Sequence, residues 1–312
     1  MPHDYYEYLF AGIVLFCSLC VFYLSHKFWS YKRKLIYSSS EFSSCINPNC
    51  VRCIRYRQVI VRACERYKQL CKLQTEFVGW TQRIEKSLQI NSKHNSSGNM
   101  SDDRGSNPLV FDLKDLNSEE FYNPYSCEKL ADDVKMLEGK KETICSDFLT
   151  VNEPEYQHLW LKNDTPNGHW RVFHLINQGK VVENNVTLCE RTFALLSNLK
   201  NVMNRNVFGN VLFSVVNPGT TISRHYGPTN IRIRCHLGLV TVDKCSLTVS
   251  GQQRKWQKGE CLLFNDSFAH EVHHKGGEED GSRCVFIVDL WHPDITHQER
   301  NAIDYIFSPV NK

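Results

Sequence analysis

Five side chains in the C-terminal part of the chain are of the types that bind metals and anions. They are three histidines and two arginines, namely His225, Arg234, His236, His270 and Arg283. Neutral imidazole is a good ligand for iron, zinc or copper, and the guanidinium fork fits a carboxylate. The histidines lie far apart in sequence beside β-branched runs, and the strands of a β-barrel can bring such residues together at its mouth. The set predicts a metal site with an anion clamp.

The second half of the chain has the periodicity of strands that would position these side chains. Segments 126–137 and 190–203 have helical apolar spacing. Six other segments have strand composition, and most are separated by Gly, Pro, Asn or Asp: HWRVFHLIN, NVLFSVV, IRIRCHLGLVTV, CSLTVS, ECLLFN and CVFIVDLW. Short strands punctuated in this way predict a mainly β fold, a double-sheet jelly roll with flanking helices on its outside.

Polar and apolar residues alternate along the predicted strand 231–240. Arg232, Arg234 and His236 therefore share one face of the strand, because side chains alternate with a period of two. The pattern fits a set of ligands inside the barrel. It fits a solvated outer face equally well, and the period alone does not choose between the two.

The two other histidines are expected near strand ends. His225 follows the turn 217–219, and His270 closes the loop after the strand 262–264. Arg283 enters the last apolar strand, where a buried arginine must have its charge neutralised by an ion pair or by a ligand carboxylate. Histidines or arginines taken one at a time are more often ordinary surface or core residues.

Length and composition limit the class of protein. The chain has 312 residues with 41% apolar side chains, which allows one large domain plus appendages. The formal net charge is +3, from 37 basic and 34 acidic side chains. This small excess gives no reason to expect a nucleic-acid partner.

The N-terminal tail, residues 1–7, precedes an uncharged apolar stretch, residues 8–24, which predicts a transmembrane anchor of the signal-anchor type. A cleaved signal peptide is the alternative, but the tail is acidic and no small-x-small cleavage site follows. The basic cluster 27–34 places the C-terminal part in the cytosol by the positive-inside rule. Five Asn-x-Ser/Thr tripeptides, starting at Asn95, Asn99, Asn163, Asn185 and Asn265, fit a lumenal location instead.

Residues 25–90 form a predicted basic, cysteine-rich stem. Its pair Cys50-x-x-Cys53 is a weak zinc signal, because no second close pair completes a set of four ligands, and unmatched thiols or acylation explain it equally. Residues 91–108 are rich in Ser, Asn, Gly and Asp and predict a disordered linker. Residues 109–312 make up the predicted folded domain. The spacing of the 14 cysteines predicts no disulfide framework.

Six motifs in the folded part occur in the order of a known family. They are Phe213-Ser214, Asn217-Pro218-Gly219-Thr220, His225-x-Gly227-Pro228-Thr229-Asn230, Arg232-x-Arg234-x-His236-Leu237-Gly238-Leu239, Phe264-x-Asp266-Ser267-Phe268-x-His270-Glu271-Val272 and Val288-Asp289-x-Trp291-His292-Pro293. This part of the chain, about the last 145 residues, resembles the aspartyl/asparaginyl β-hydroxylase family. The whole chain is similar to its short, membrane-anchored members.

The resemblance implies an Fe(II)- and 2-oxoglutarate-dependent dioxygenase on a double-stranded β-helix. It implies that His225 and His270 bind iron. It further implies that the carboxylates of 2-oxoglutarate are held by four residues: Ser214, Arg234, His236 and Arg283. It also implies a polypeptide substrate hydroxylated on Asp or Asn, and an endoplasmic-reticulum membrane protein with a lumenal catalytic domain.

Two departures from familiar patterns bear on this interpretation. Many such enzymes add a carboxylate to two histidines, but the residue two after His225 is Gly227, as is typical of the family. The loop 273–280 is longer and more polar than expected, and could pull Arg283 away. Its histidines are more simply solvated than metal-bound.

Two other functions remain open from the sequence. A binding or scaffold protein could retain the barrel and lack turnover, with the anchor and stem carrying its function. A zinc hydrolase could use His225 and His270, but no third ligand or general base is evident.

Overall fold

The computed structural model describes residues 50–51, 56–73, 81–93 and 105–310. The predicted membrane anchor, residues 8–24, lies outside these ranges. Within them, no helix is both long enough and apolar enough to cross a membrane.

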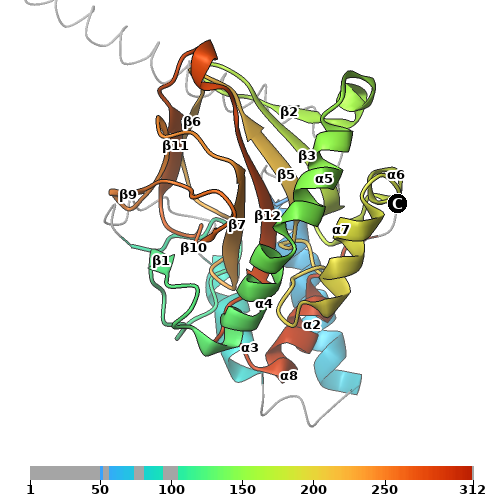
Figure 1. The fold of residues 1–312 in the computed structure, drawn as a ribbon. Coiled ribbons are helices and arrows are strands. Elements are labelled where there is room, and N and C mark those ends of the chain that lie inside the picture. Colours follow the sequence, from blue (N-terminus) through green and yellow to red (C-terminus); the bar gives the residue numbers. More distant parts are fainter. Residues whose placement is uncertain (1–49, 52–55, 74–80, 94–104, 311–312) are drawn as a thin grey trace, which may run out of the picture. The chain divides into compact units, whose positions relative to one another are not determined.

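Two antiparallel sheets form the body of the fold (Figure 1). The major sheet contains, in spatial order, β1 (Phe121–Tyr122), β10 (Cys261–Phe264), β7 (Arg232–Val240), β12 (Arg283–Trp291), β5 (Val211–Val216), β3 (Trp170–Asn177) and β2 (Leu161–Asn163), with β4 (Lys180–Val181) paired to β3. The minor sheet contains β6 (Thr221–His225), β11 (His270–His274), β8 (Cys245–Val249) and β9 (Gln252–Arg254).

The chain from β5 to β12 passes back and forth between the two sheets. β5, β7, β10 and β12 belong to the major sheet, while β6, β8, β9 and β11 belong to the minor sheet. This alternation is the topology of a jelly roll, so the predicted mainly β fold with flanking helices is confirmed. All six predicted strands are present. The sequence did not predict β6 and β11, which carry the two candidate metal ligands.

Helices cover the outer face of the major sheet. α4 (Glu128–Gly139) and α5 (Lys141–Val151) cross it, with α7 (Glu190–Leu195) beside them (Figure 1). Their apolar side chains pack on alternate residues of the strands, such as Ile233 and Leu237 of β7. Because strand side chains alternate, the neighbouring residues of β7 point to the other face of the sheet.

The inner face of the major sheet packs against the minor sheet. Leu212 and Ile287 from the major sheet share this second core with Leu247 and Val272 from the minor sheet. Cys235 and Cys261, in contrast, are buried on the helix-covered face. The space between the sheets is therefore lined by the alternate residues of each strand, and these include most of the predicted site.

A third core lies at one end of the barrel. α2 (Tyr56–Leu73) and α3 (Gln82–Lys93) pack there with α8 (His297–Ile306), around Phe111 and Phe307. The guanidinium of Arg83 in α3 donates to the Glu299 carboxylate of α8 at 2.8 and 2.9 Å. α2 and most of α3 belong to the predicted stem, residues 25–90, and these contacts tie the described part of that segment to the domain.

Short helices connect the remaining elements: η3 (Pro154–Leu159), α6 (Glu183–Val186), η4 (Leu196–Asn198) and η5 (Glu278–Asp280). The helix predicted for 126–137 corresponds to α4. The helix predicted for 190–203 is shorter than expected, because the chain turns into η4 and then becomes extended at Leu199.

Candidate metal and anion site

His225 and His270 face each other at the edge of the minor sheet. His225 ends β6, His270 begins β11, and the two residues are direct partners in the antiparallel ladder. Their ring centroids are 4.1 Å apart. A register shift follows between His270 and Val272, so the pairing is irregular next to the histidines. The sheet thus brings together two imidazoles that are 45 positions apart by their residue numbers.

Backbone contacts fix the orientation of both rings. Nδ1 of His225 lies 2.7 Å from the Ser223 carbonyl oxygen, and Nδ1 of His270 lies 2.9 Å from that of Phe268. A carbonyl only accepts, so each Nδ1 carries a proton, and in a neutral ring Nε2 then keeps its lone pair. Burial, helped by the neighbouring His225, lowers the pKa of His270 to about 3, so its ring is neutral at physiological pH. Neutral imidazoles oriented in this way are suited to bind a metal through Nε2.

The structure leaves no room for a third ligand side chain at position 227. A Cβ added to Gly227 would lie 2.5 Å from Cγ of Asp266 and 2.6 Å from both of its carboxylate oxygens. The Asp266 carboxylate therefore fills the space into which a side chain at position 227 would project. Among the described residues, no three His, Cys, Asp or Glu side chains converge as a metal site. Two histidines are the protein ligands that the geometry offers.

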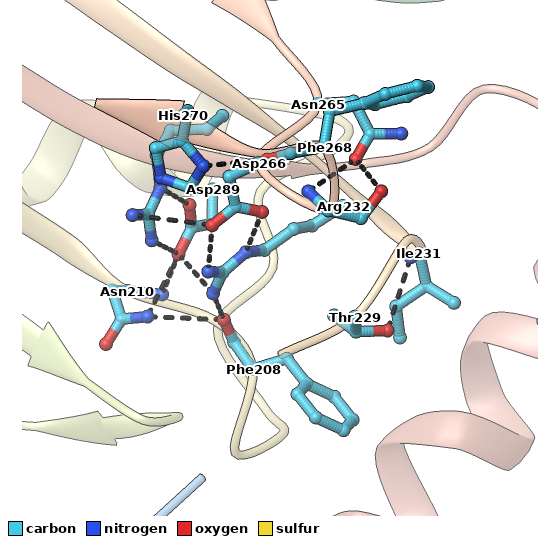
Figure 2. A network of polar contacts seen from close by, with 12 residues as sticks. Phe208, Asn210, Thr229, Ile231, Arg232, Asn265, Asp266, Phe268, His270 and Asp289 are labelled. Carbon is cyan, nitrogen blue, oxygen red and sulfur yellow. Dashed lines mark hydrogen bonds and ion pairs between the residues drawn. The ribbon is translucent and has the colours of Figure 1, made fainter. Parts of the chain in front are cut away.

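Four charged side chains form a buried charge network behind the histidines: Arg232, Arg234, Asp266 and Asp289. Figure 2 shows the Arg232 guanidinium between the two carboxylates, 2.5 Å from Asp266 and 3.2 Å from Asp289. Arg234 donates to both Asp289 oxygens, at 2.9 and 3.1 Å, and its Nη1 lies 3.6 Å from Asp266. The network contains two cations and two anions, so its formal charges cancel.

The network is also tied to the backbone. Asp289 accepts from the backbone and side-chain amides of Asn210, and Arg232 donates to the Phe208 carbonyl (Figure 2). Burial alone would raise the pKa of Asp266, but Arg232 and Arg234 outweigh it and hold that pKa well below its usual range. The carboxylate stays ionised, and it precedes His270 by four residues in the loop between β10 and β11.

Arg283 lies apart from this network, and no carboxylate of the described residues forms an ion pair with it. It is 1% exposed, and none of the ion pairs among the described residues includes it. Its Nη1 donates to the Ser214 carbonyl at 3.3 Å, and its guanidinium stacks on Trp256 at 4.4 Å. Its Nε finds no hydrogen-bond acceptor in the described part of the chain. A buried cation in this state requires an anion.

His236, Ser214 and Trp256 lie close to Arg283, and these four residues form a candidate anion pocket. Nδ1 of His236 accepts from the Trp256 indole at 3.2 Å, so the proton of its neutral ring is on Nε2. That Nε2 is buried and has no partner among the described residues. Burial, and then the charge of Arg283, lower the pKa of His236 well below its usual value. The Ser214 hydroxyl accepts from the Trp170 indole at 3.1 Å and keeps its own proton to donate.

A cavity of about 390 Å³ opens beside His225. Its polar wall includes Arg234 and Asp266, and its apolar wall includes Val172, Leu212 and Ile287. It is large enough for a small ligand or an amino-acid side chain next to the histidine pair.

The model of the Aspartyl/Asparaginyl beta-hydroxylase family matches residues 138–293, half of the chain, and spans the histidine pair, the charge network and the anion pocket. The chain belongs to this family. The human "Aspartate beta-hydroxylase domain-containing protein 2" is 40% identical over 272 residues, which cover 85% of this chain and 70% of that protein.

Other relatives match less of their own length. The human "Aspartate beta-hydroxylase domain-containing protein 1" is 46% identical over 207 residues, covering 65% of this chain and 52% of that protein. The mouse "Aspartyl/asparaginyl beta-hydroxylase" is 36% identical over 177 residues, which are 55% of this chain and 23% of that protein. A crystal structure of a Pseudomonas putida prolyl-4-hydroxylase has a TM-score of 0.34 at 11% identity, covering 49% of this chain and 87% of that one.

Most of the site residues predicted from the sequence lie on the face of the major sheet that is turned toward the minor sheet. The alternative that Arg232, Arg234 and His236 form a solvated outer face is wrong, because Arg232 and His236 are buried and the side chain of Arg234 is 15% exposed. For Arg283 the sequence left an ion pair or a ligand carboxylate as partner, and no ion pair of Arg283 is present among the described residues. Arg234 differs from Arg283, since the protein itself supplies carboxylates to Arg234.

The polar loop 273–280 neither displaces Arg283 nor offers ligands. Arg283 remains paired with Val216 at the start of β12. Nε2 of His274 lies 2.9 Å from the Gly281 carbonyl, and its Nδ1 accepts from a backbone amide at 3.2 Å. Both nitrogens of His274 are used within the loop.

Sequence reasoning missed the acidic half of the charge network and both tryptophans. The sequence could have identified Asp289, because a carboxylate inside the apolar run CVFIVDLW must be paired when that strand is buried. No sequence feature identified Asp266 or Trp256, since their roles depend on how loops fold over the barrel mouth.

Proposed function

We propose that this chain is an Fe(II)- and 2-oxoglutarate-dependent dioxygenase that hydroxylates Asp or Asn side chains of a polypeptide. Family membership supports a hydroxylase-type activity. The observation that carries the assignment of the co-substrate is Arg283, a buried guanidinium with an unpartnered Nε and no carboxylate partner, next to a histidine pair oriented for a metal.

The residues present fit the two groups. Nε2 of His225 and Nε2 of His270 would hold the iron. The guanidinium of Arg283, the Ser214 hydroxyl and Nε2 of His236 are donors for carboxylate oxygens of 2-oxoglutarate, and donors aimed at a dianion in a dry pocket bind it strongly. Arg234 lines the cavity, where its remaining N–H groups could donate to a co-substrate carboxylate.

Iron(II) with 2-oxoglutarate and O2 supplies the chemistry that converts a C–H bond to C–OH while 2-oxoglutarate becomes succinate and CO2. The chain holds and orients the partners. Asp266 occupies the place of the missing third side-chain ligand and keeps its charge, so it can accept hydrogen bonds from water near the histidines. The apolar wall of the cavity excludes bulk water from the reacting groups.

We further propose that residues 8–24 anchor the protein in the endoplasmic-reticulum membrane with the catalytic domain in the lumen. Among the Asn-x-Ser/Thr tripeptides, Asn185 and Asn265 are buried and are not accessible to glycosylation in the folded domain. Asn95 and Asn99 lie outside the described residues. Glycosylation of Asn95 or Asn99 in cells, lost in Asn95→Gln and Asn99→Gln variants, supports the lumenal orientation. Cytosolic protease access to residues 109–312 in sealed vesicles contradicts it.

The enzyme assignment competes with an inactive binding or scaffold protein on the same fold. The test is succinate formation by the full-length chain in detergent, supplied with Fe(II), 2-oxoglutarate, O2 and polypeptides containing Asp and Asn. We expect metal-dependent succinate that is abolished in His270→Ala and retained in His273→Ala, its matched control outside the site. A folded wild type that binds 2-oxoglutarate but forms no succinate with any polypeptide supports the scaffold instead.

A further inference from the structure

Two polar side chains line the cavity on the strands farthest from the charge network. Asn163 is the last residue of β2, and His174 lies on β3. In the major sheet, β3 is separated from β7, which carries Arg232 and Arg234, by β5 and β12. The cavity therefore has one end near the histidine pair and the charge network, and a second polar end near β2 and β3.

The amide of Asn163 has an unused donor at this second end. Its Nδ2 has almost no exposed surface and no hydrogen-bond partner among the described residues. Such a group costs free energy unless a ligand or water satisfies it. His174 is buried, and its carbonyl oxygen accepts from Asn185 Nδ2 at 2.7 Å, which fixes the strand beside the cavity.

The charges around the cavity argue against an acidic substrate side chain. Arg232 and Arg234 are the lining cations, and both are already paired with Asp266 and Asp289. Asp164, next to Asn163, adds a carboxylate to the lining. Arg283 is not part of this lining. An aspartate side chain entering the cavity would bring a negative charge with no unmatched lysine or arginine among the lining residues.

We propose that the far end of the cavity is a subsite for a neutral carboxamide, so that the chain selects asparagine over aspartate as the target residue. The substrate carbonyl oxygen accepts from Asn163 Nδ2, and the His174 imidazole lies beside the carboxamide. The methylene to be hydroxylated then points toward the histidine pair. This subsite rests on the proposed dioxygenase function and assigns its substrate class.

The test compares two synthetic peptide libraries with the same randomised flanks and a fixed central Asn or Asp. The full-length chain in detergent is loaded with Fe(II) and 2-oxoglutarate without oxygen, and retained peptides are quantified by mass spectrometry. We expect at least about tenfold greater retention of the Asn library. Admission of oxygen should then add one oxygen atom to the central residue of retained peptides.

Variants locate the subsite. Asn163→Asp replaces the unused donor with a carboxylate, and we expect it to lose at least about tenfold in retention of Asn peptides. His174→Ala should lose retention as well. Asn167→Asp makes the same chemical change at an exposed position outside the cavity lining and should behave as the wild type.

The binding of 2-oxoglutarate is measured for the wild type and every variant, so that failure of the carboxamide subsite can be told apart from failure of the proposed function. If 2-oxoglutarate binds normally but the Asp library is retained equally or better, or neither library is retained, the subsite is wrong and the co-substrate assignment stands. Wild-type retention by a folded Asn163→Asp variant also overturns the subsite. Loss of 2-oxoglutarate binding in the wild type would contradict the proposed function itself.

Discussion

Three arginines lie between the sheets, and they differ in their partners. Arg232 and Arg234 are matched by Asp266 and Asp289, so their charges cancel within the protein. Arg283 is buried as well, but it contacts a carbonyl, a tryptophan face and the Cys245 thiol, and its Nε has no partner among the described residues. The protein neutralises the charges of Arg232 and Arg234 with its own carboxylates. The charge of Arg283 is left for a bound anion to neutralise.

This difference suggests a structural role for the charge network and a ligand-binding role for Arg283. A buried ion pair whose members satisfy one another fixes neighbouring backbone, and breaking it leaves an uncompensated charge. A single buried cation costs stability in the ligand-free protein and favours an anion when one is present. We therefore assign the charge network to holding the His270 loop, and Arg283 to binding the co-substrate.

The largest expected effect comes from unbalancing the network. Asp289→Asn keeps the shape but removes one of two carboxylates, which leaves a net buried cation. We expect a loss of about 3–5 kcal/mol in the free energy of unfolding, measured by urea denaturation. A loss below about 1 kcal/mol would show that the network is not balanced by Asp289.

Adding a side chain at Gly227, beside the charge network, should lower the unfolding free energy less than Asp289→Asn does. Gly227→Ala places a Cβ against the Asp266 carboxylate, which Arg232 holds in position. We expect a loss of about 1–3 kcal/mol in unfolding free energy. Gly139→Ala, at a helical glycine with nothing within 4 Å of the added Cβ, is the matched control and should not destabilise the protein. Equal stabilities for the two variants would contradict the tight fit at Gly227.

Acid should lower the stability of the folded protein, because His236 stays neutral when folded and takes up a proton only on unfolding. His236 has a folded-state pKa well below its unfolded value, because of burial and then Arg283. The unfolded state therefore binds more protons below about pH 6.5, and stability is lost as the pH falls. Between about pH 7.5 and pH 5, we expect His236→Asn to lose about 2 kcal/mol less than the wild type in denaturation curves. Equal pH slopes would contradict a neutral, buried His236.

The smallest expected effect is a gain in unfolding free energy, opposite in sign to the effect of Asp289→Asn. Arg283→Met removes a buried charge that lacks a carboxylate partner and keeps much of the side-chain volume. Without 2-oxoglutarate, we expect its unfolding free energy to match or exceed that of the wild type by about 1 kcal/mol. A loss as large as that of Asp289→Asn would show that Arg283 is balanced within the protein.

The sequence was sufficient for the jelly roll and for the shared face of Arg232, Arg234 and His236, because alternation along an apolar strand is a local property. It did not predict β6 or β11, whose short polar sequences TISRH and HEVHH lack that alternation. They become strands through tertiary pairing, β6 with β11 and β11 also with β8. Nor could the sequence assign partners to the arginines.

Those partners depend on register. Arg234 meets Asp289 because β7 and β12 are aligned at these two residues. Arg283 lies at the other end of β12, opposite Val216, where no carboxylate of the described chain reaches it. The same residue type thus acquires two roles from its position along two paired strands.

The most direct test of the co-substrate assignment is a titration of 2-oxoglutarate into the full-length, Fe(II)-loaded chain without oxygen. We expect saturable, metal-dependent binding that weakens at least about thirtyfold in Arg283→Ala and is unchanged in Lys255→Ala, which removes an exposed cation near the pocket. Wild-type affinity in a folded Arg283→Ala variant, or no binding by folded, iron-loaded wild type, would contradict the account.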